Sequence, residues 1–442
     1  MSTHHTAADN PPVPKESLLL LAAGTASLLV LQYRTLPKFS MLPAVFPSFD
    51  QFRIRVAEVV HLTGEDLLWF ALPMLCFAAL MVREWQQSSV TKLLHWVFVS
   101  NRRTWIGLLV LTAVWVRFYW ALGEGRWVGD AGAHIAYAIA ASNAIKSLEF
   151  PIWTNLLGVG APYLQYYGFL YFYLVGILEF FIRDIFASIK VSLWLGHTIS
   201  AAAMYLFARE VLQSRAAAFV AALAYVASFW HIQQTLLMGR FPVSLFYALL
   251  PLPFYVFERV LRGDHRPSTL GLGGILLGAI PMVHPGYGFW ATGFFGIYAI
   301  LRLLTEPTSH PRAIRSFMAM TLLGLAFGAY ITLGMLLERG GTILESGVLL
   351  SDVPDPSWKR IFLWSNLLFS VAPLHGEELM WYGGYLGTSL LVLAAVGAVL
   401  NSRFTRTRKM NGMPVFVCLA LAFLLVFGYR LSLLQASSWI GP

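Results

Sequence analysis

Cysteine is almost absent from this chain. Cys76 and Cys418 are the two cysteines in 442 residues, and each lies inside an apolar run. There they provide neither a disulfide framework nor a cysteine metal site, and we expect them to pack as small core residues. Two catalytic signatures are missing as well. No GxxxxGKS or GxxxxGKT loop occurs, which argues against ATP-driven transport, and no HExxH occurs, which argues against a zinc protease.

Charged residues are scarce, and apolar residues dominate. Only 12% of residues are charged, whereas 57% are hydrophobic and 15% aromatic, a balance typical of membrane proteins. The apolar runs lack the alternation of a transmembrane barrel, and crossing the hydrocarbon takes about 20 apolar residues. We therefore predict an all-α, polytopic transmembrane bundle of about 11–13 helices. The predicted spans are 17–33, 67–82, 105–122, 168–182, 187–207, 215–231, 243–261, 269–283, 287–304, 316–337, 383–400 and 414–431.

Two regions are expected. Residues 1–104 should hold an N-terminal pair of transmembrane helices and a basic cytoplasmic loop, since the start of the chain lacks a small-residue cleavage site and should remain as a helix. Residues 105–442 should form the main transmembrane domain. Two long segments within it, 123–167 and 338–382, are predicted outer loops, and loops of this length usually carry function or their own structure.

The basic residues predict the orientation of the chain. The formal net charge is +9, from 31 Lys and Arg against 22 Asp and Glu, and the positive residues gather in short loops between apolar runs. Such a bias marks cytoplasmic loops rather than a nucleic-acid surface, so we expect a bilayer and no nucleic acid as partner. The predicted cytoplasmic loops are 83–104, 262–266, 302–315 and 403–409. The helix at 105–122 would then deliver Asp130 to the outer side.

Strict alternation of the predicted spans conflicts with this orientation. It places Asp130 and the basic loop at 401–410 on the same side, although they should lie on opposite sides. One crossing between residues 163 and 242 is therefore miscounted. The run at 168–182 and the basic turn at 208–215 are the two places where the error can lie.

The stretch RWVGDAGAHIAY, residues 126–137, begins the first predicted outer loop. Asp130 stands where an N-cap would begin a helix from Ala131 to Leu148, and the proline at 151 would end it. Its apolar positions give this helix one side that can lie on the bilayer surface. An aromatic segment follows, which suits contact with an apolar substrate.

Several motifs in the chain occur together in one known group of enzymes. They are Gly129-Asp130-x-x-x-His134, Pro151-x-Trp153, Gly158-x-x-x-Pro162-Tyr163, Gln165-Tyr166-Tyr167, the turn at 208–215, Gly239-Arg240-Phe241-Pro242, His284-Pro285 and the segment 381–387. Over roughly 105–430 the chain resembles membrane-integral glycosyltransferases of the GT-C superfamily. The resemblance is strongest to a prokaryotic branch labelled as 6-pyruvoyl-tetrahydropterin synthase-related membrane proteins.

The resemblance implies transfer of a sugar from a polyprenyl-phosphate-linked donor to a glycan, lipid or protein acceptor at the extracytoplasmic face. It assigns the catalytic carboxylate to Asp130, and a carboxylate can take the acceptor proton. Arg240 is our candidate for the leaving phosphate, because a guanidinium matches that charge and shape. A divalent metal on Asp130 and His134 is a further prediction. The remaining predicted substrate-binding residues are His284, Trp153, Tyr163 and Tyr166.

Each assignment has a simpler alternative. Asp130 can merely cap its helix, and His134 can be a surface polar residue. Arg240 can extend to the lipid headgroups, and His284 can simply end a helix at the membrane boundary. The aromatic residues can form an ordinary interfacial belt.

Two other functions remain open. The chain can be a transporter or flippase of a lipid-linked saccharide, a class that also has helices interrupted by Gly and Pro. It can also be a catalytically silent glycan-binding membrane protein. The silent alternative stays open because Val243 stands where the related branch commonly has an acidic residue.

Overall fold

The apolar runs fold into helices, as the sequence predicts. The computed structural model describes residues 15–39, 63–121, 130–149, 153–154, 161–162, 167–232, 234–235, 239–305 and 311–337. Almost all of these residues are helical, and one two-residue antiparallel ladder joins β1 (Trp153–Thr154) to β2 (Ala161–Pro162). The described part of the chain is an all-α bundle. The predicted outer loop at 338–382 and the spans at 383–400 and 414–431 lie outside the described residues.

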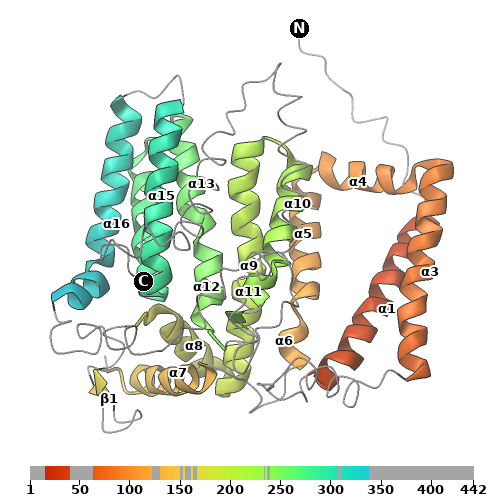
Figure 1. Ribbon diagram of the computed structural model, residues 1–442, viewed down its shortest axis with the longest axis horizontal. Coiled ribbons are helices and arrows are strands. Elements are labelled where there is room, and N and C mark those ends of the chain that lie inside the picture. Colours follow the sequence, from red (N-terminus) through yellow and green to blue (C-terminus); the bar gives the residue numbers. More distant parts are fainter. Residues whose placement is uncertain are drawn as a thin grey trace, which may run out of the picture.

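The helices fall into three groups in space (Figure 1). The upright bundle contains α5 (Asn101–Trp115), α9 (Ile185–Leu212), α10 (Arg215–Val226), α12 (Pro242–Leu249), α13 (Pro251–Leu261), α14 (Pro267–Val283), α15 (Pro285–Thr305) and α16 (Pro311–Leu337). A hairpin of α1 (Lys15–Phe39) and α3 (Gly64–Gln87) stands beside it. The ends carry α4 (Ser89–Val99), α6 (Phe118–Ala121), α7 (Ala131–Lys146) and α8 (Leu170–Ile182), and α11 (Phe229–Ile232) follows α10.

Several of these helices are membrane-spanning by length and composition. Five in the described part of the chain qualify: Gly64–Gln87, Ile185–Leu212, Pro242–Leu261, Pro285–Thr305 and Pro311–Leu337. The third combines α12 and α13, which meet at Leu250. The chain is therefore a multi-pass integral membrane protein. Of the predicted N-terminal pair, α3 is among the five and α1 is not.

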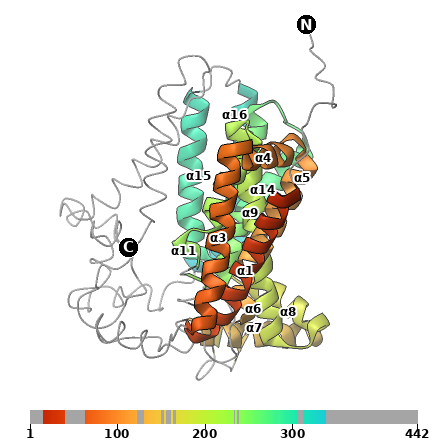
Figure 2. The same cartoon turned by 90° about the vertical axis from the view of Figure 1, so that its right-hand side faces the viewer.

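The span predicted at 168–182 does not cross the bundle. Its helix, α8, has 13 residues, which at about 1.5 Å per residue is roughly 20 Å, well short of a hydrocarbon core of about 30 Å. Both views place α8 beside α7 at the lower end (Figures 1 and 2). Without this crossing, strict alternation of the remaining predicted spans places Asp130 and the basic loop at 401–410 on opposite sides. The ends of α9, α13 and α15 lie at the upper end of the molecule, opposite α7 (Figure 1).

Helix α7 lies across the lower end of the bundle, as predicted for an interfacial helix (Figure 1). It begins at Ala131, directly after Asp130, whose carbonyl accepts the His134 N–H at 3.1 Å. It ends at Lys146, where Leu148 takes a left-handed φ of 56° and the Glu149 N–H bonds back to the Ala144 carbonyl. The predicted end at Leu148 is thus two residues late, because a local turn stops the helix before the proline.

A close contact joins α7 to α8. A Cβ on Gly176 would lie 3.1 Å from the backbone nitrogen of Ser142, so a larger residue there would force the two helices to shift slightly. The Glu179 carboxylate completes the contact, accepting from the Ser142 hydroxyl at 2.5 Å and from Lys146 Nζ at 2.9 Å. The two helices form one unit at the end of the bundle that also holds Asp130.

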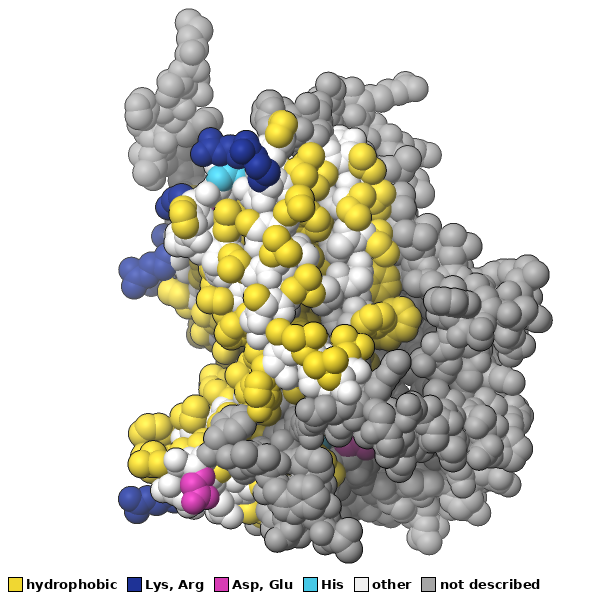
Figure 3. Space-filling view, turned by 90° about the vertical axis from the view of Figure 1, so that its left-hand side faces the viewer, with side chains coloured by type: hydrophobic (Ala, Val, Ile, Leu, Met, Phe, Trp, Pro, Cys, Tyr) yellow, Lys and Arg dark blue, Asp and Glu magenta, His cyan; other side chains and the backbone are white. Residues whose placement is uncertain are grey.

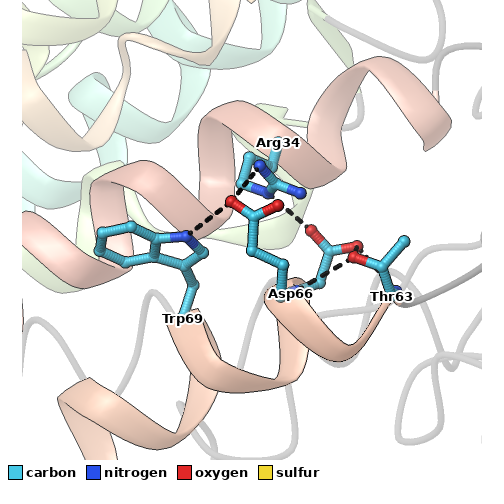
Figure 4. A network of polar contacts seen from close by, with 5 residues as sticks. Arg34, Thr63, Asp66 and Trp69 are labelled. Carbon is cyan, nitrogen blue, oxygen red and sulfur yellow. Dashed lines mark hydrogen bonds and ion pairs between the residues drawn. The ribbon is translucent and has the colours of Figure 1, made fainter.

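The α1–α3 hairpin is joined by a polar network at its lower end (Figure 4). Asp66 and Thr63 form a capping box at the start of α3, an arrangement that satisfies two helix-end donors. Arg34 of α1 reaches across to Asp66 and Glu65, each at 2.8 Å. The Asp66 side chain is fully buried, whereas that of Glu65 is 59% exposed.

The surface follows the same division between apolar middle and polar ends. On the face drawn in Figure 3, hydrophobic side chains cover the middle of the molecule, and Lys and Arg gather mainly toward the upper end. The basic loop predicted at 83–104 is not simply a loop, because α4 occupies Ser89–Val99 within it. Cys76 of α3 is a free cysteine and is partly buried.

The hairpin network predicts unequal costs for two neighbouring carboxylates. Asp66→Ala should destabilise the protein by about 2 kcal/mol, because it removes both a helix cap and a buried partner of Arg34. Glu65→Ala should change stability by less than about 1 kcal/mol, since its ion pair is largely exposed. Thermal unfolding in detergent would measure both changes. Equal losses in the two variants would contradict the structural assignment.

Candidate functional site

Asp130 and Arg240 meet although they are 110 positions apart in the sequence. Arg240 Nε donates to Asp130 Oδ2 at 3.0 Å, and the two side chains are 23% and 48% exposed, respectively. Asp130 occupies the N-cap position of α7, but its carboxylate caps no backbone N–H. The cap therefore does not explain the carboxylate. Arg240 does more than extend to the headgroups, because most of its side chain is buried and its Nε pairs with Asp130.

A turn at Gly239 presents Arg240 to Asp130. Gly239 has a φ of +64°, a left-handed conformation that suits glycine. Its carbonyl accepts a hydrogen bond from His134 Nδ1 at 2.8 Å, and His134 Nε2 lies 3.1 Å from the Tyr167 hydroxyl. His134 is 3% exposed, so its alternative role as a surface polar residue is wrong. Instead, it fastens the Gly239 turn to α7.

Two further side chains hold the guanidinium of Arg240. Its Nη1 donates to Gln234 Oε1 and to the Tyr287 hydroxyl, both at 3.0 Å, and Tyr287 in turn donates to Gln234 Oε1 at 3.0 Å. The backbone N–H of Arg240 also donates to the Gln234 carbonyl at 2.9 Å. The guanidinium is therefore oriented by two segments besides α7: the Gln234 turn and α15.

His284 joins the same group of residues from the end of α14. It follows the last helical residue, as a helix terminator would, and its ring also stacks on Tyr287 at 4.3 Å. The ring centroid of Tyr167 lies 5.3 Å from that of His284. Gly168 permits the approach, because a Cβ there would stand 2.1 Å from the Val283 carbonyl oxygen.

Burial sets the charges in this cluster. Burial lowers the pKa of His134 to about 4, although its bond to the Gly239 carbonyl opposes the shift. Burial also lowers the pKa of His284 to about 4, and the nearby Arg240 charge adds to that effect. Both imidazoles are therefore neutral at pH 7, which leaves Asp130 and Arg240 as the charged pair of the site.

An apolar pocket of about 400 Å³ lies next to this pair. Tyr287 belongs to both: its ring lines the pocket, and its hydroxyl bonds to Arg240. The other lining residues come from α9, α12, α13 and α15 and are apolar throughout: Met204, Phe207, Phe246, Leu250, Pro251, Phe254, Trp290, Ala291 and Phe294. The charged pair thus lies beside an apolar pocket.

The sequence found part of this site. Asp130, His134, Arg240 and His284 converge, whereas Trp153 is placed only by its backbone in β1, and Tyr163 and Tyr166 lie outside the described residues. Gln234 and Tyr287 were missed. Tyr287 has one usable signal, because it stands three residues after His284 at the start of a helix.

The described geometry fits a resident metal poorly. Both His134 nitrogens are engaged with protein groups, and Asp130 already pairs with Arg240. Within the described residues, no three His, Cys, Asp or Glu side chains gather as a metal-binding group. A metal bound by Asp130 and His134 stays a prediction.

The buried histidine predicts a loss of stability in acid. The unfolded chain protonates His134 near pH 6.5, whereas the folded protein resists until about pH 4. The contribution of His134 to the free energy of unfolding is therefore fully present above pH 6.5. It is lost as the pH falls from 6.5 to 4, by at most about 3 kcal/mol. Thermal unfolding across that range should show a shallower slope for His134→Asn, which keeps a donor for Gly239. An unchanged slope would contradict the burial of His134.

Comparisons with known proteins add no family assignment. A scan of the chain against models of protein families found no match, and a search of curated protein sequences found none. The functional interpretation therefore depends on the geometry of the site and on the motif resemblance.

Proposed function

We propose that this protein is a glycosyltransferase that uses a polyprenyl-phosphate-linked sugar and works at the extracytoplasmic face of the membrane. One observation carries the proposal: the Asp130–Arg240 pair adjoins an apolar pocket through Tyr287. A donor of this class has a phosphate next to a long apolar chain. The site has a guanidinium, which can bind the phosphate, next to an apolar pocket, which can hold the lipid chain.

The charged pair supplies the two groups that the transfer needs. The acceptor hydroxyl oxygen attacks the anomeric carbon, the bond from that carbon to the phosphate oxygen breaks, and the hydroxyl proton passes to Asp130. The phosphate leaves with its negative charge on the lipid, where Arg240 stabilises it. Gln234 and Tyr287 hold the guanidinium in a fixed orientation, so little reorganisation is needed when the charge develops.

The orientation of the helices supports the extracytoplasmic side. Asp130 lies at the end of the bundle opposite the turns that carry Arg209, Arg215, Arg262 and Arg266. Cytoplasmic loops are enriched in Lys and Arg, so the end with the site is the outer one. The same end holds α7 and α8, the unit that lies at the membrane boundary.

The first test replaces the two charged residues. Asp130→Asn should lower turnover by about 10²–10⁴-fold, because it removes the proton acceptor, and Arg240→Gln by about 10²–10³-fold. Release of polyprenyl phosphate from a polyprenyl-phosphate sugar would measure this. Asp184→Asn is the matched control, because Asp184 caps α9 through the Ala187 N–H at 2.8 Å and lies outside the site. It should retain full activity.

The same assay separates the alternatives. Full turnover by Asp130→Asn would refute the assigned base. Movement of the donor across liposomes without sugar transfer would favour a flippase. Binding of the donor with neither turnover nor transport, by the unaltered protein, would favour the silent glycan-binding alternative.

A second test addresses the junction between the charged pair and the pocket. Tyr287→Phe keeps the ring in the pocket but removes the hydroxyl that contacts Arg240 and Gln234. We expect a loss of about 10-fold in kcat/KM, comparable with removal of one hydrogen bond to a charged group. The kinetics should be measured with the same donor at several concentrations. An unaltered kcat/KM would show that Tyr287 does not help to orient Arg240 in the reaction.

A further inference from the structure

Helix α4 lies across the upper end of the molecule, between α3 and α5 (Figures 1 and 2). Ser88 turns the chain between α3 and α4 with a left-handed φ of 50°. The Glu84 carboxylate then accepts the N–H groups of Val90 at 2.6 Å and Thr91 at 3.0 Å. The start of α4 is thus fixed at a steep angle to the membrane-spanning α3.

The other end of α4 is fastened to the bundle. The Thr104 hydroxyl donates to the Val97 carbonyl at 3.0 Å, and Arg215 Nη1 donates to the Phe98 carbonyl at 3.0 Å. Arg209 reaches Asn101 directly after α4. Because both ends are held, α4 is a rigid element that runs along the membrane boundary.

This corner of the molecule exposes apolar side chains. On α4, Leu94 is 48% exposed, Trp96 42% and Val99 45%. The adjoining helices continue the apolar surface toward the middle of the molecule, with Met81, Val82 and Trp85 on α3 and Ile106, Leu109 and Val110 on α5. A helix with exposed apolar residues that lies along the boundary is typical of contact with the acyl-headgroup region of a bilayer.

The same corner is basic. Arg102 and Arg103 are both exposed, and the Arg103 guanidinium lies 4.3 Å from the centroid of the Trp96 ring. The acidic groups that the described residues place here are already engaged: Glu84 caps α4, and Glu16 pairs with Arg83 at 3.3 Å. Arg103 also donates to the Trp96 carbonyl at 3.2 Å, which holds its exposed guanidinium at this corner, so both arginines present positive charge at the surface.

We propose that α4 and the start of α5 form a binding site for the headgroup of an anionic phospholipid. Arg102 and Arg103 would contact the phosphate, Trp96 would lie at headgroup level, and the acyl chains would run along the exposed faces of α3 and α5. A lipid is the expected occupant because the charges stand at the boundary and the apolar surface continues below them, in the order of a phospholipid. The site lies at the end of the bundle away from Asp130 and does not depend on the proposed function.

The test is a lipid titration of the full chain in neutral detergent, followed by native mass spectrometry. Phosphatidylglycerol should bind on the order of tenfold more tightly than phosphatidylcholine. The double variant Arg102→Gln and Arg103→Gln should lose that preference, and the double variant with Lys at both positions should keep most of it. The matched control replaces Arg312 and Arg315 with Gln, because both are exposed at the start of α16, away from α4.

Two results would overturn the proposal. One is equal binding of the two lipids by the unaltered protein. The other is an equal loss of preference in the Arg312 and Arg315 control, which would show that overall charge, not this corner, attracts the lipid. The Lys variant keeps the positive charge at both positions. If it keeps the preference for phosphatidylglycerol, the charge and not the arginine side chain itself attracts the lipid.

Discussion

The ion pair between Asp130 and Arg240 is the constraint on which the architecture of the site depends. Asp130, which directly precedes α7, lies with its Oδ2 3.0 Å from Nε of Arg240, which follows the Gly239 turn. The second bond between the same segments, from His134 to the Gly239 carbonyl, keeps the turn in the conformation that presents the guanidinium. Burying the mostly enclosed Arg240 guanidinium is costly unless it is hydrogen-bonded, and Gln234 and Tyr287 satisfy it beside Asp130.

Most of the fold was accessible from the sequence because apolar run length is a direct consequence of hydrocarbon thickness. The described helices of these spans begin within about five residues of the predicted runs and end within about seven, and α7 begins where Asp130 indicates. The error at 168–182 has a physical cause. A short run of Leu, Phe and Tyr is compatible with a helix at the membrane boundary as well as with a membrane span. The contact of Gly176 with α7, which distinguishes the two, is visible only in the structure.

The site was less accessible than the fold. Asp130, His134, Arg240 and His284 could be predicted because they belong to the motifs that carry the resemblance and because ionisable groups are rare beside apolar runs. Gln234 and Tyr287 are single polar residues without a recognisable spacing, and the pocket is assembled from four helices. The sequence could not distinguish a helix cap from an ion pair as the role of Asp130, because an aspartate directly before a helix is compatible with both roles. The decision came from the position of a turn 110 residues away.

The distance in sequence between these partners has a consequence for biogenesis. Membrane helices leave the ribosome in order, so α7 reaches the lipid boundary before the Gly239 turn and α15 are made. Until residue 240 has emerged, Asp130 stands at the membrane surface without its guanidinium partner, and until residue 287 has emerged that guanidinium lacks the phenol that holds it. A chain that stops before Arg240 would thus contain a carboxylate without its partner, and the complete cluster marks a polypeptide whose insertion has passed the start of α15.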